Sequence, residues 1–84
     1  NTFNANAVAM ADFDMVDIVR EMNIAAARIA REAVDAANAE DPTKTRYVAG
    51  ALGPCTRSAS VVVDADRPEY RNVSFDELYA AYRE

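Results

Sequence analysis

The chain has 84 residues, a formal net charge of -5 and nine basic residues scattered along it. This size corresponds to one small domain or to part of a larger one, and the acidic balance excludes nucleic-acid binding, which needs clustered Lys and Arg. No apolar stretch reaches the roughly 20 residues of a membrane span, so we expect no membrane partner.

The first half of the chain predicts a loop and then one long helix. Residues 1–11 are small and apolar with three asparagines, which is typical of a loop. The acidic residues that follow favour a helix start, where negative charge is stabilised: Asp12, Asp14 and Asp17. Apolar residues then recur every three or four positions, as on one face of an α-helix: Ile18, Met22, Ala25, Ile29, Ala33 and Ala36. Pro42 disfavours helix at Asp41, so we predict a helix from about Asp14 to Ala39.

A buried strand is predicted next. "RYVAGALG" (residues 46–53) is short and apolar and does not alternate cleanly, which is typical of a strand covered on both faces. A long helix followed by a buried strand indicates one αβ step of a parallel sheet. Gly53-Pro54 ends the strand, and residues 55–72 are predicted to be a loop.

The last segment carries the most specific local signal. In "VSFDELYAAY", Ser74 occupies the N-cap position and Glu77 falls three residues later, which is the spacing of a capping box. Val73 and Leu78 stand at the positions of a hydrophobic staple. We therefore predict a helix that begins after Ser74, and this signal is structural rather than catalytic.

Cys55 invites a chemical role, but the sequence argues against one. A zinc site needs three or four ligands, and a cysteine nucleophile normally needs a base such as His, whereas the chain has one Cys and no His. We interpret Cys55 as a small loop residue, and a single cysteine fits a reducing cytoplasm. Two acidic clusters are interpreted as helix-start or solvated charges rather than cation or acid–base sites: Asp12, Asp14 and Asp17, and Asp64, Asp66 and Glu69.

Two loops are candidate walls of a functional site. In parallel α/β folds, sites form beyond the carboxyl ends of strands. "GPCTRS" (residues 53–58) follows the predicted strand, and "NTFN" (residues 1–4) would hold the same position if another strand ended just before it. The pattern does not identify the ligand.

Five segments in order along the chain carry a family resemblance: "NTFNANAVAMADFDM", "EMNIAAARIAREAVDAA", "RYVAGALGP", "TRSAS" and "YRNVSFDELYAAYRE". Together they resemble the homocysteine-binding domain of the cobalamin-dependent methionine synthases. The resemblance implies an α/β fold, the (βα)8 TIM barrel. Because such a barrel needs about 250 residues, residues 1–84 would be a fragment of about two βα units, helix-rich with one strand and incomplete at both ends.

The resemblance also implies a reaction. In that family a zinc ion held by three cysteines binds the homocysteine thiolate, which takes a methyl group from methylcobalamin carried by another domain. The matching positions in this chain are expected to bind substrate rather than to catalyse or to hold metal: Asn1, Thr2, Phe3, Gly53 and Pro54. Cys55 does not match a zinc ligand. We therefore expect a cytoplasmic methyltransferase with cobalamin and folate domains as partners, and an isolated fragment without activity.

Two alternatives stay open. One is a fragment of a homocysteine methyltransferase that uses betaine or S-methylmethionine in place of cobalamin. The other is a non-catalytic helical interaction module, which the alanine-rich helix and the capped last helix would support. An isolated chain whose buried-type strand has no neighbour is also expected to self-associate, because an unpaired strand is a template for pairing.

Overall fold

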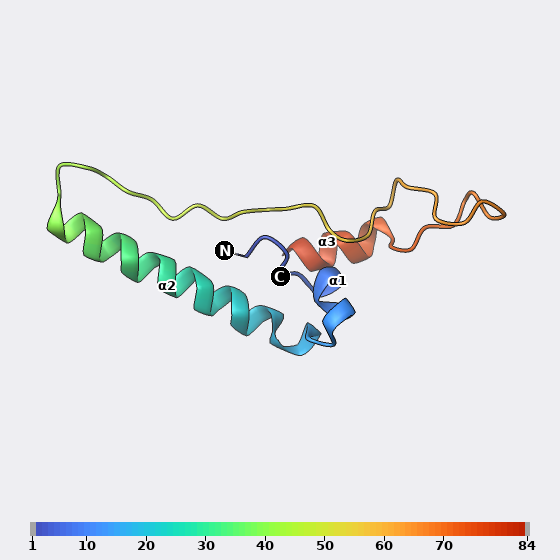
Figure 1. The fold of residues 1–84 in the computed structure, drawn as a ribbon, viewed down its shortest axis with the longest axis horizontal. Coiled ribbons are helices and arrows are strands. Elements are labelled where there is room, and N and C mark those ends of the chain that lie inside the picture. The colour runs from blue at the N-terminus through green and yellow to red at the C-terminus, as the bar shows by residue number, and fades with distance from the viewer. Residues whose placement is uncertain (1, 84) are drawn as a thin grey trace.

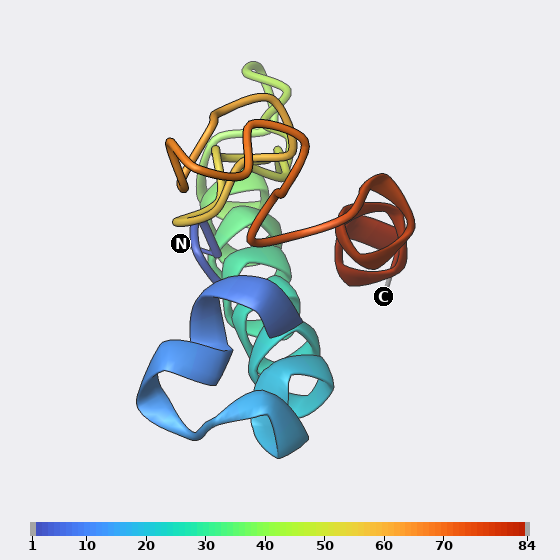
Figure 2. The same ribbon diagram turned by 90° about the vertical axis from the view of Figure 1, so that its right-hand side faces the viewer.

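The computed structural model describes residues 2–83, and its regular structure is helical. A short helix, α1 (Ala7–Met10), is followed by two 3-10 turns, η1 (Ala11–Phe13) and η2 (Val16–Ile18), and by the long helix α2 (Val19–Glu40). After α2 the chain reverses and runs back alongside it, and the last helix, α3 (Phe75–Arg83), lies next to α1 (Figure 1). Figure 2 shows α2 nearly end-on, with the returning segment still beside it.

No strand is present among residues 2–83, so the prediction of an α/β fold, a TIM-barrel piece with a strand at residues 46–53, is wrong. In particular, the backbone groups of residues 47–52 make no hydrogen bond with any described residue. A strand forms only when a neighbouring strand exchanges backbone hydrogen bonds with it. The apolar pattern of this segment indicates burial, but it does not supply that partner. The prediction of a loop over residues 55–72 is confirmed.

The beginning of α2 differs from the prediction because Asp14 interrupts the helix. Asp14 adopts a left-handed conformation with a φ of 56°. Its N–H donates to the Ala11 carbonyl at 3.2 Å, and the N–H of Met15 donates to the Met10 carbonyl at 3.1 Å. These two bonds form a Schellman motif, which ends a helix. A separate helix therefore begins only at Val19, and the predicted loop over residues 1–11 contains the turn α1.

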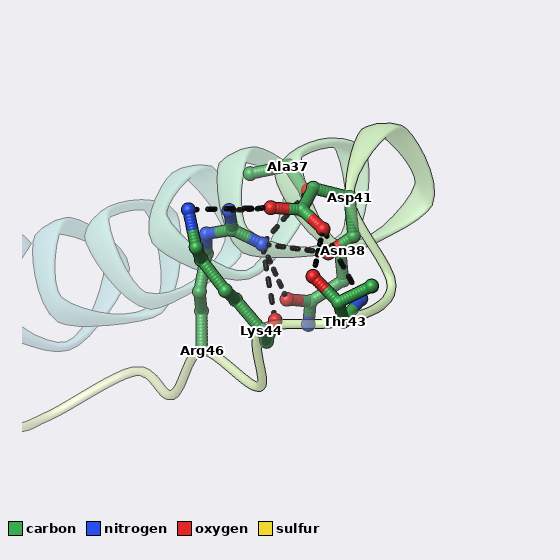
Figure 3. Close-up of polar contacts among 6 residues, drawn as sticks. All are labelled: Ala37, Asn38, Asp41, Thr43, Lys44 and Arg46. Carbon is green, nitrogen blue, oxygen red and sulfur yellow. Dashed lines mark hydrogen bonds and ion pairs between the residues drawn. The ribbon is translucent and has the colours of Figure 1, made fainter.

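The end of α2 agrees with the prediction to within one residue, and the structure shows what stabilises it (Figure 3). The guanidinium of Arg46 donates to the carbonyl of Ala37 at 3.0 Å and to that of Asp41 at 3.1 Å. Each of these carbonyls also accepts a backbone N–H, from Asp41 and Lys44 respectively, so the guanidinium adds a charge-assisted hydrogen bond to each and complements the helix dipole. The Asp41 carboxylate accepts hydrogen bonds from the N–H and hydroxyl of Thr43, which lower its pKa.

The capping box of α3 is confirmed. The hydroxyl of Ser74 accepts from the N–H of Glu77 at 3.2 Å, and the Glu77 carboxylate accepts from the N–H of Ser74 at 2.7 Å. The Ser74 hydroxyl also donates to that carboxylate at 2.8 Å. The hydrogen bonds from Ser74 hold the pKa of Glu77 below its ordinary value. Val73 is buried, as a staple residue would be.

The described chain is elongated. Its radius of gyration is 17.3 Å, whereas a compact chain of this length would have about 12 Å. The buried apolar residues among residues 2–83 are few and small: Ala9, Val19, Val73 and Ala81. They lie where α1, α3 and the beginning of α2 come together, away from the far end of α2. No helix within residues 2–83 is long and apolar enough to cross a membrane.

The predicted apolar face of α2 is largely exposed. Ile29 keeps 67% of its surface accessible and Ile18 keeps 39%. The face of α2 that contacts the rest of the chain is offset by one residue from the predicted face, and its first residue is the fully buried Val19. Next along it, the Asn23 amide donates to the carbonyls of Ala5 at 2.7 Å and Val19 at 3.0 Å. Residue spacing identifies which side chains share a helix face, but the neighbouring chain decides which face is covered.

Candidate functional site

The two loops singled out from the sequence meet in the structure. Gly53 is buried beneath the ring of Phe3, and a Cβ added at Gly53 would lie 2.6 Å from the ring atom Cζ. Gly53 does not adopt a positive φ, so glycine is needed here for close approach and not for backbone conformation. Residues 2–3 and residue 53, distant in sequence, therefore form one surface.

A small cavity of about 100 Å³ lies at this meeting point. Thr2, Phe3 and Gly53 line it, as do side chains from three helical regions: Asn6, Asn23 and Tyr82. The Tyr82 hydroxyl donates a hydrogen bond to the Gly53 carbonyl at 2.6 Å, which ties α3 to the loop. The cavity combines hydroxyl and amide groups with an aromatic ring, a mixture that suits a small polar ligand with an apolar part.

Asn6 anchors one side of the cavity and is 6% exposed. Its Oδ1 accepts from the N–H of Ala9 at 3.0 Å, which caps α1, and from the Cys55 thiol at 3.1 Å. The thiol therefore acts as a hydrogen-bond donor that holds residues 53–55 against α1. This contact agrees with the interpretation of Cys55 as a structural loop residue.

The Tyr82 hydroxyl keeps its proton more firmly than an ordinary tyrosine. The neighbouring Cys55 thiol, and after it partial desolvation, raise the pKa of Tyr82. At neutral pH it is therefore a donor that holds the Gly53 carbonyl. None of the described residues that line the cavity is a carboxylate, lysine or histidine, so this arrangement can bind and orient a ligand, and Tyr82 is the one titratable side chain among the described residues of its lining.

The remaining part of the second loop turns away from the cavity. Pro54 lies in a separate hollow of about 420 Å³ on another side of Tyr82, so the structure does not bring it together with Thr2 and Phe3. Arg57 pairs with Asp12 at 3.0 Å, and the Thr56 hydroxyl donates to the same carboxylate at 3.2 Å. These contacts fix the loop over η1.

Of the five site residues expected from the sequence, the structure therefore gathers Thr2, Phe3 and Gly53, while Asn1 lies outside the described residues. Sequence reasoning missed Asn6, Asn23 and Tyr82. Asn6 carried a usable signal, because asparagine is a favoured N-cap residue. Nothing local marked Tyr82, since its role depends on where α3 packs.

A metal centre is not formed by the described part of the chain. No group of three or more His, Cys, Asp or Glu side chains within residues 2–83 is placed to hold a metal ion. The resemblance implies a three-cysteine zinc site for the whole enzyme and none within this chain, which has one cysteine and no histidine. Two of the acidic side chains form ion pairs with arginine: Asp12 binds Arg57, and Asp64 pairs with Arg67 at 2.8 Å.

Comparison with protein families shows which family this chain is related to. The family model described as Homocysteine S-methyltransferase matches residues 1–84. The chain belongs to the homocysteine S-methyltransferase family. This membership connects the chain with methylation of homocysteine in general, and confirms the resemblance at the level of the family. The assignment to the cobalamin-dependent branch of the homocysteine S-methyltransferases is finer than this match and stays a prediction.

Proposed function

We propose that this chain is part of an enzyme that transfers a methyl group from methylcobalamin to the homocysteine thiolate, giving methionine. Its own contribution would be one wall of the homocysteine pocket. Two observations support this proposal. The family match spans the whole chain, and the side chains of Thr2, Phe3 and Tyr82 converge with Gly53 on one small cavity.

The described residues would bind and position substrate rather than react with it. The Phe3 ring offers an apolar surface for the homocysteine side chain, while Thr2 and Asn23 offer polar groups for its charged end. Tyr82 and Asn6 hold the cavity walls in place. Because the described lining of the cavity holds no carboxylate, lysine or histidine, we propose that the isolated chain is inactive and that other domains supply zinc, cobalamin and folate.

Two other donors, betaine and S-methylmethionine, fit the family match equally well at this level. The cobalamin branch is preferred because the resemblance extends through "AMADF" and "SFDELYAAYRE". A non-catalytic helical module is disfavoured, because the match is to an enzyme family over residues 1–84. A cytoplasmic location belongs to the same proposal, since Cys55 is a free thiol.

Binding and activity measurements on the chain test the proposal. Calorimetric titration with L-homocysteine should show binding that Gly53→Ala weakens, because the added Cβ displaces the Phe3 ring from the cavity. Gly50→Ala is the matched control, since a Cβ there meets nothing within 4 Å. Equal affinity in both variants, or no binding to the unaltered chain, would contradict the proposed pocket.

Activity is assayed separately with each methyl donor: methylcobalamin, betaine and S-methylmethionine. The isolated chain should form no methionine from any of them. Methionine formation from betaine or S-methylmethionine would overturn both the proposed inactivity and the cobalamin assignment. Formation from methylcobalamin would overturn the inactivity alone.

A further inference from the structure

Asn23 connects α2 with the loop that carries Thr2 and Phe3. Its amide nitrogen donates to the carbonyl of Ala5 at 2.7 Å and to the carbonyl of Val19 at 3.0 Å. Carbonyl oxygens only accept hydrogen bonds, so the nitrogen of the amide, and not its oxygen, faces them. Both N–H groups of Asn23 are therefore committed to the backbone, and only its Oδ1 is left for a ligand.

The bond to Ala5 acts on a short turn. The N–H of Ala5 donates to the carbonyl of Thr2 at 3.1 Å, so residues 2–5 form one turn, and Asn23 ties its last residue to α2. Phe3 lies inside this turn, and its ring covers Gly53. A displacement of Ala5 would therefore move the Phe3 ring relative to Gly53.

The chain is also held on both sides of this bond. Val19, which accepts the second hydrogen bond of Asn23, is fully buried at the beginning of α2. Asn6, the residue after Ala5, is buried as well, and its Oδ1 accepts from the N–H of Ala9 and from the thiol of Cys55. Because these neighbours are anchored, the hydrogen bond between Asn23 and Ala5 fixes the turn to a firm support.

We propose that Asn23 is a positioning residue for homocysteine, which acts through Ala5 to hold Thr2 and Phe3 in the arrangement that forms the cavity with Gly53. The inference rests on the proposed function, because that function assigns the cavity to homocysteine. Without this bond the turn would also adopt arrangements that do not form the cavity. The apparent affinity for a ligand falls with the fraction of molecules in the binding arrangement.

Replacing Asn23 by aspartate separates positioning from direct contact with the substrate. Asn and Asp have the same shape and similar helix propensities, but Asn23→Asp puts an oxygen in place of the nitrogen that faces the Ala5 and Val19 carbonyls. If Asn23 acted mainly by binding the ammonium group of homocysteine, a carboxylate would strengthen that contact and affinity would rise. The proposal predicts the opposite, a several-fold loss of affinity, up to the roughly tenfold that one lost hydrogen bond can cause.

Asn38→Asp is the matched control, because it makes the same change of charge in the same helix. Asn38 lies near the end of α2, where its Oδ1 accepts from Arg46 at 3.4 Å (Figure 3), and it does not line the cavity. Calorimetric titration with L-homocysteine should give this variant the affinity of the unaltered chain. Circular dichroism checks that both variants keep their helix content.

Proton NMR of the ligand-free chain reports the position of the Phe3 ring. One Hα of Gly53 points to the place where an added Cβ would meet that ring, so the ring should shift its resonance. Asn23→Asp should reduce this shift, and Asn38→Asp should leave it unchanged. A role of Asn23 in global stability alone would not alter the shift in the folded chain.

The outcomes distinguish this inference from the proposed function. Lower affinity and a reduced Gly53 shift in Asn23→Asp, with neither in Asn38→Asp, would support the positioning role. Unchanged or tighter binding of homocysteine by Asn23→Asp, or an unchanged Gly53 shift, would overturn it, and the pocket itself would stand if Gly53→Ala still weakened binding. No binding of homocysteine to the unaltered chain would overturn the proposed function and this inference together.

Discussion

Replacing Gly53 by alanine tests the close approach of the two loops. The added Cβ would lie 2.6 Å from Cζ of Phe3, whereas carbon atoms in favourable contact are about 3.5–4.0 Å apart. The ring must therefore retreat by about 1 Å or more. Because Gly53 has no positive φ, alanine adds no backbone strain, and the whole cost comes from this contact.

The size of the effect follows from how freely Phe3 can move. Overpacking typically costs about 1–3 kcal/mol, and Phe3 is already 46% exposed, so the ring can swing outward. We therefore expect Gly53→Ala to lower the free energy of unfolding by about 1 kcal/mol, near the lower limit of this range. The equivalent change at Gly50 should be neutral or stabilising by up to about 1 kcal/mol, because alanine reduces the freedom of the unfolded chain.

Urea unfolding followed through the amide signals of residues 53 and 82 provides the measurement. A double-mutant cycle with Phe3→Ala isolates the contact, since Gly53→Ala should cost little once the ring is absent. We expect a coupling of about 1 kcal/mol between the two positions. If Gly53→Ala proved as harmless as Gly50→Ala, or if the two changes were simply additive, the packing of Phe3 on Gly53 would be refuted.

Four further predictions concern the contacts that hold the chain together. Ser74→Ala should destabilise α3 by about 1 kcal/mol through loss of the N-cap, seen as faster amide exchange in its first turn. Because folding lowers the pKa of Glu77, the contribution of its carboxylate to the stability of the folded chain should be complete above the ordinary glutamate pKa of 4.5. This contribution should be lost as the pH falls through the lower pKa of the folded state, and Glu77→Gln should remove the pH dependence. Arg46→Gln should speed exchange in the last turn of α2 by an amount equivalent to about 0.5–1 kcal/mol, and unchanged exchange would contradict the capping role. Tyr82→Phe should cost about 1 kcal/mol by removing the hydrogen bond to Gly53, and calorimetric affinity for homocysteine should fall with it.

Local signals predicted the structure well where the interaction partners are close in sequence. The capping box joins Ser74 to a residue three positions later, so its geometry follows from the sequence alone. Pro42 acts on the residue before it, which placed the end of α2 within one residue. The acidic pattern predicted the wrong start for α2, because Asp14 takes a left-handed conformation that divides the helix.

Long-range structure could not be predicted in the same way. The apolar sequence of residues 46–53 is compatible with a buried strand, but a strand depends on a partner that the pattern does not specify. The expectation that residues 2–3 and Gly53 would lie together rested on a sheet that the described chain does not contain, yet these residues meet. Their meeting depends on Phe3 packing and on the Tyr82 hydrogen bond, and neither has a local signature.

An amide NMR titration of the chain with L-homocysteine tests most directly whether this meeting point is a substrate pocket. We expect shifts that saturate with ligand and that are largest at Thr2, Phe3, Gly53 and Tyr82, with little change in the far half of α2. Shifts confined to other residues, or no saturable change, would contradict the assignment of the cavity to homocysteine.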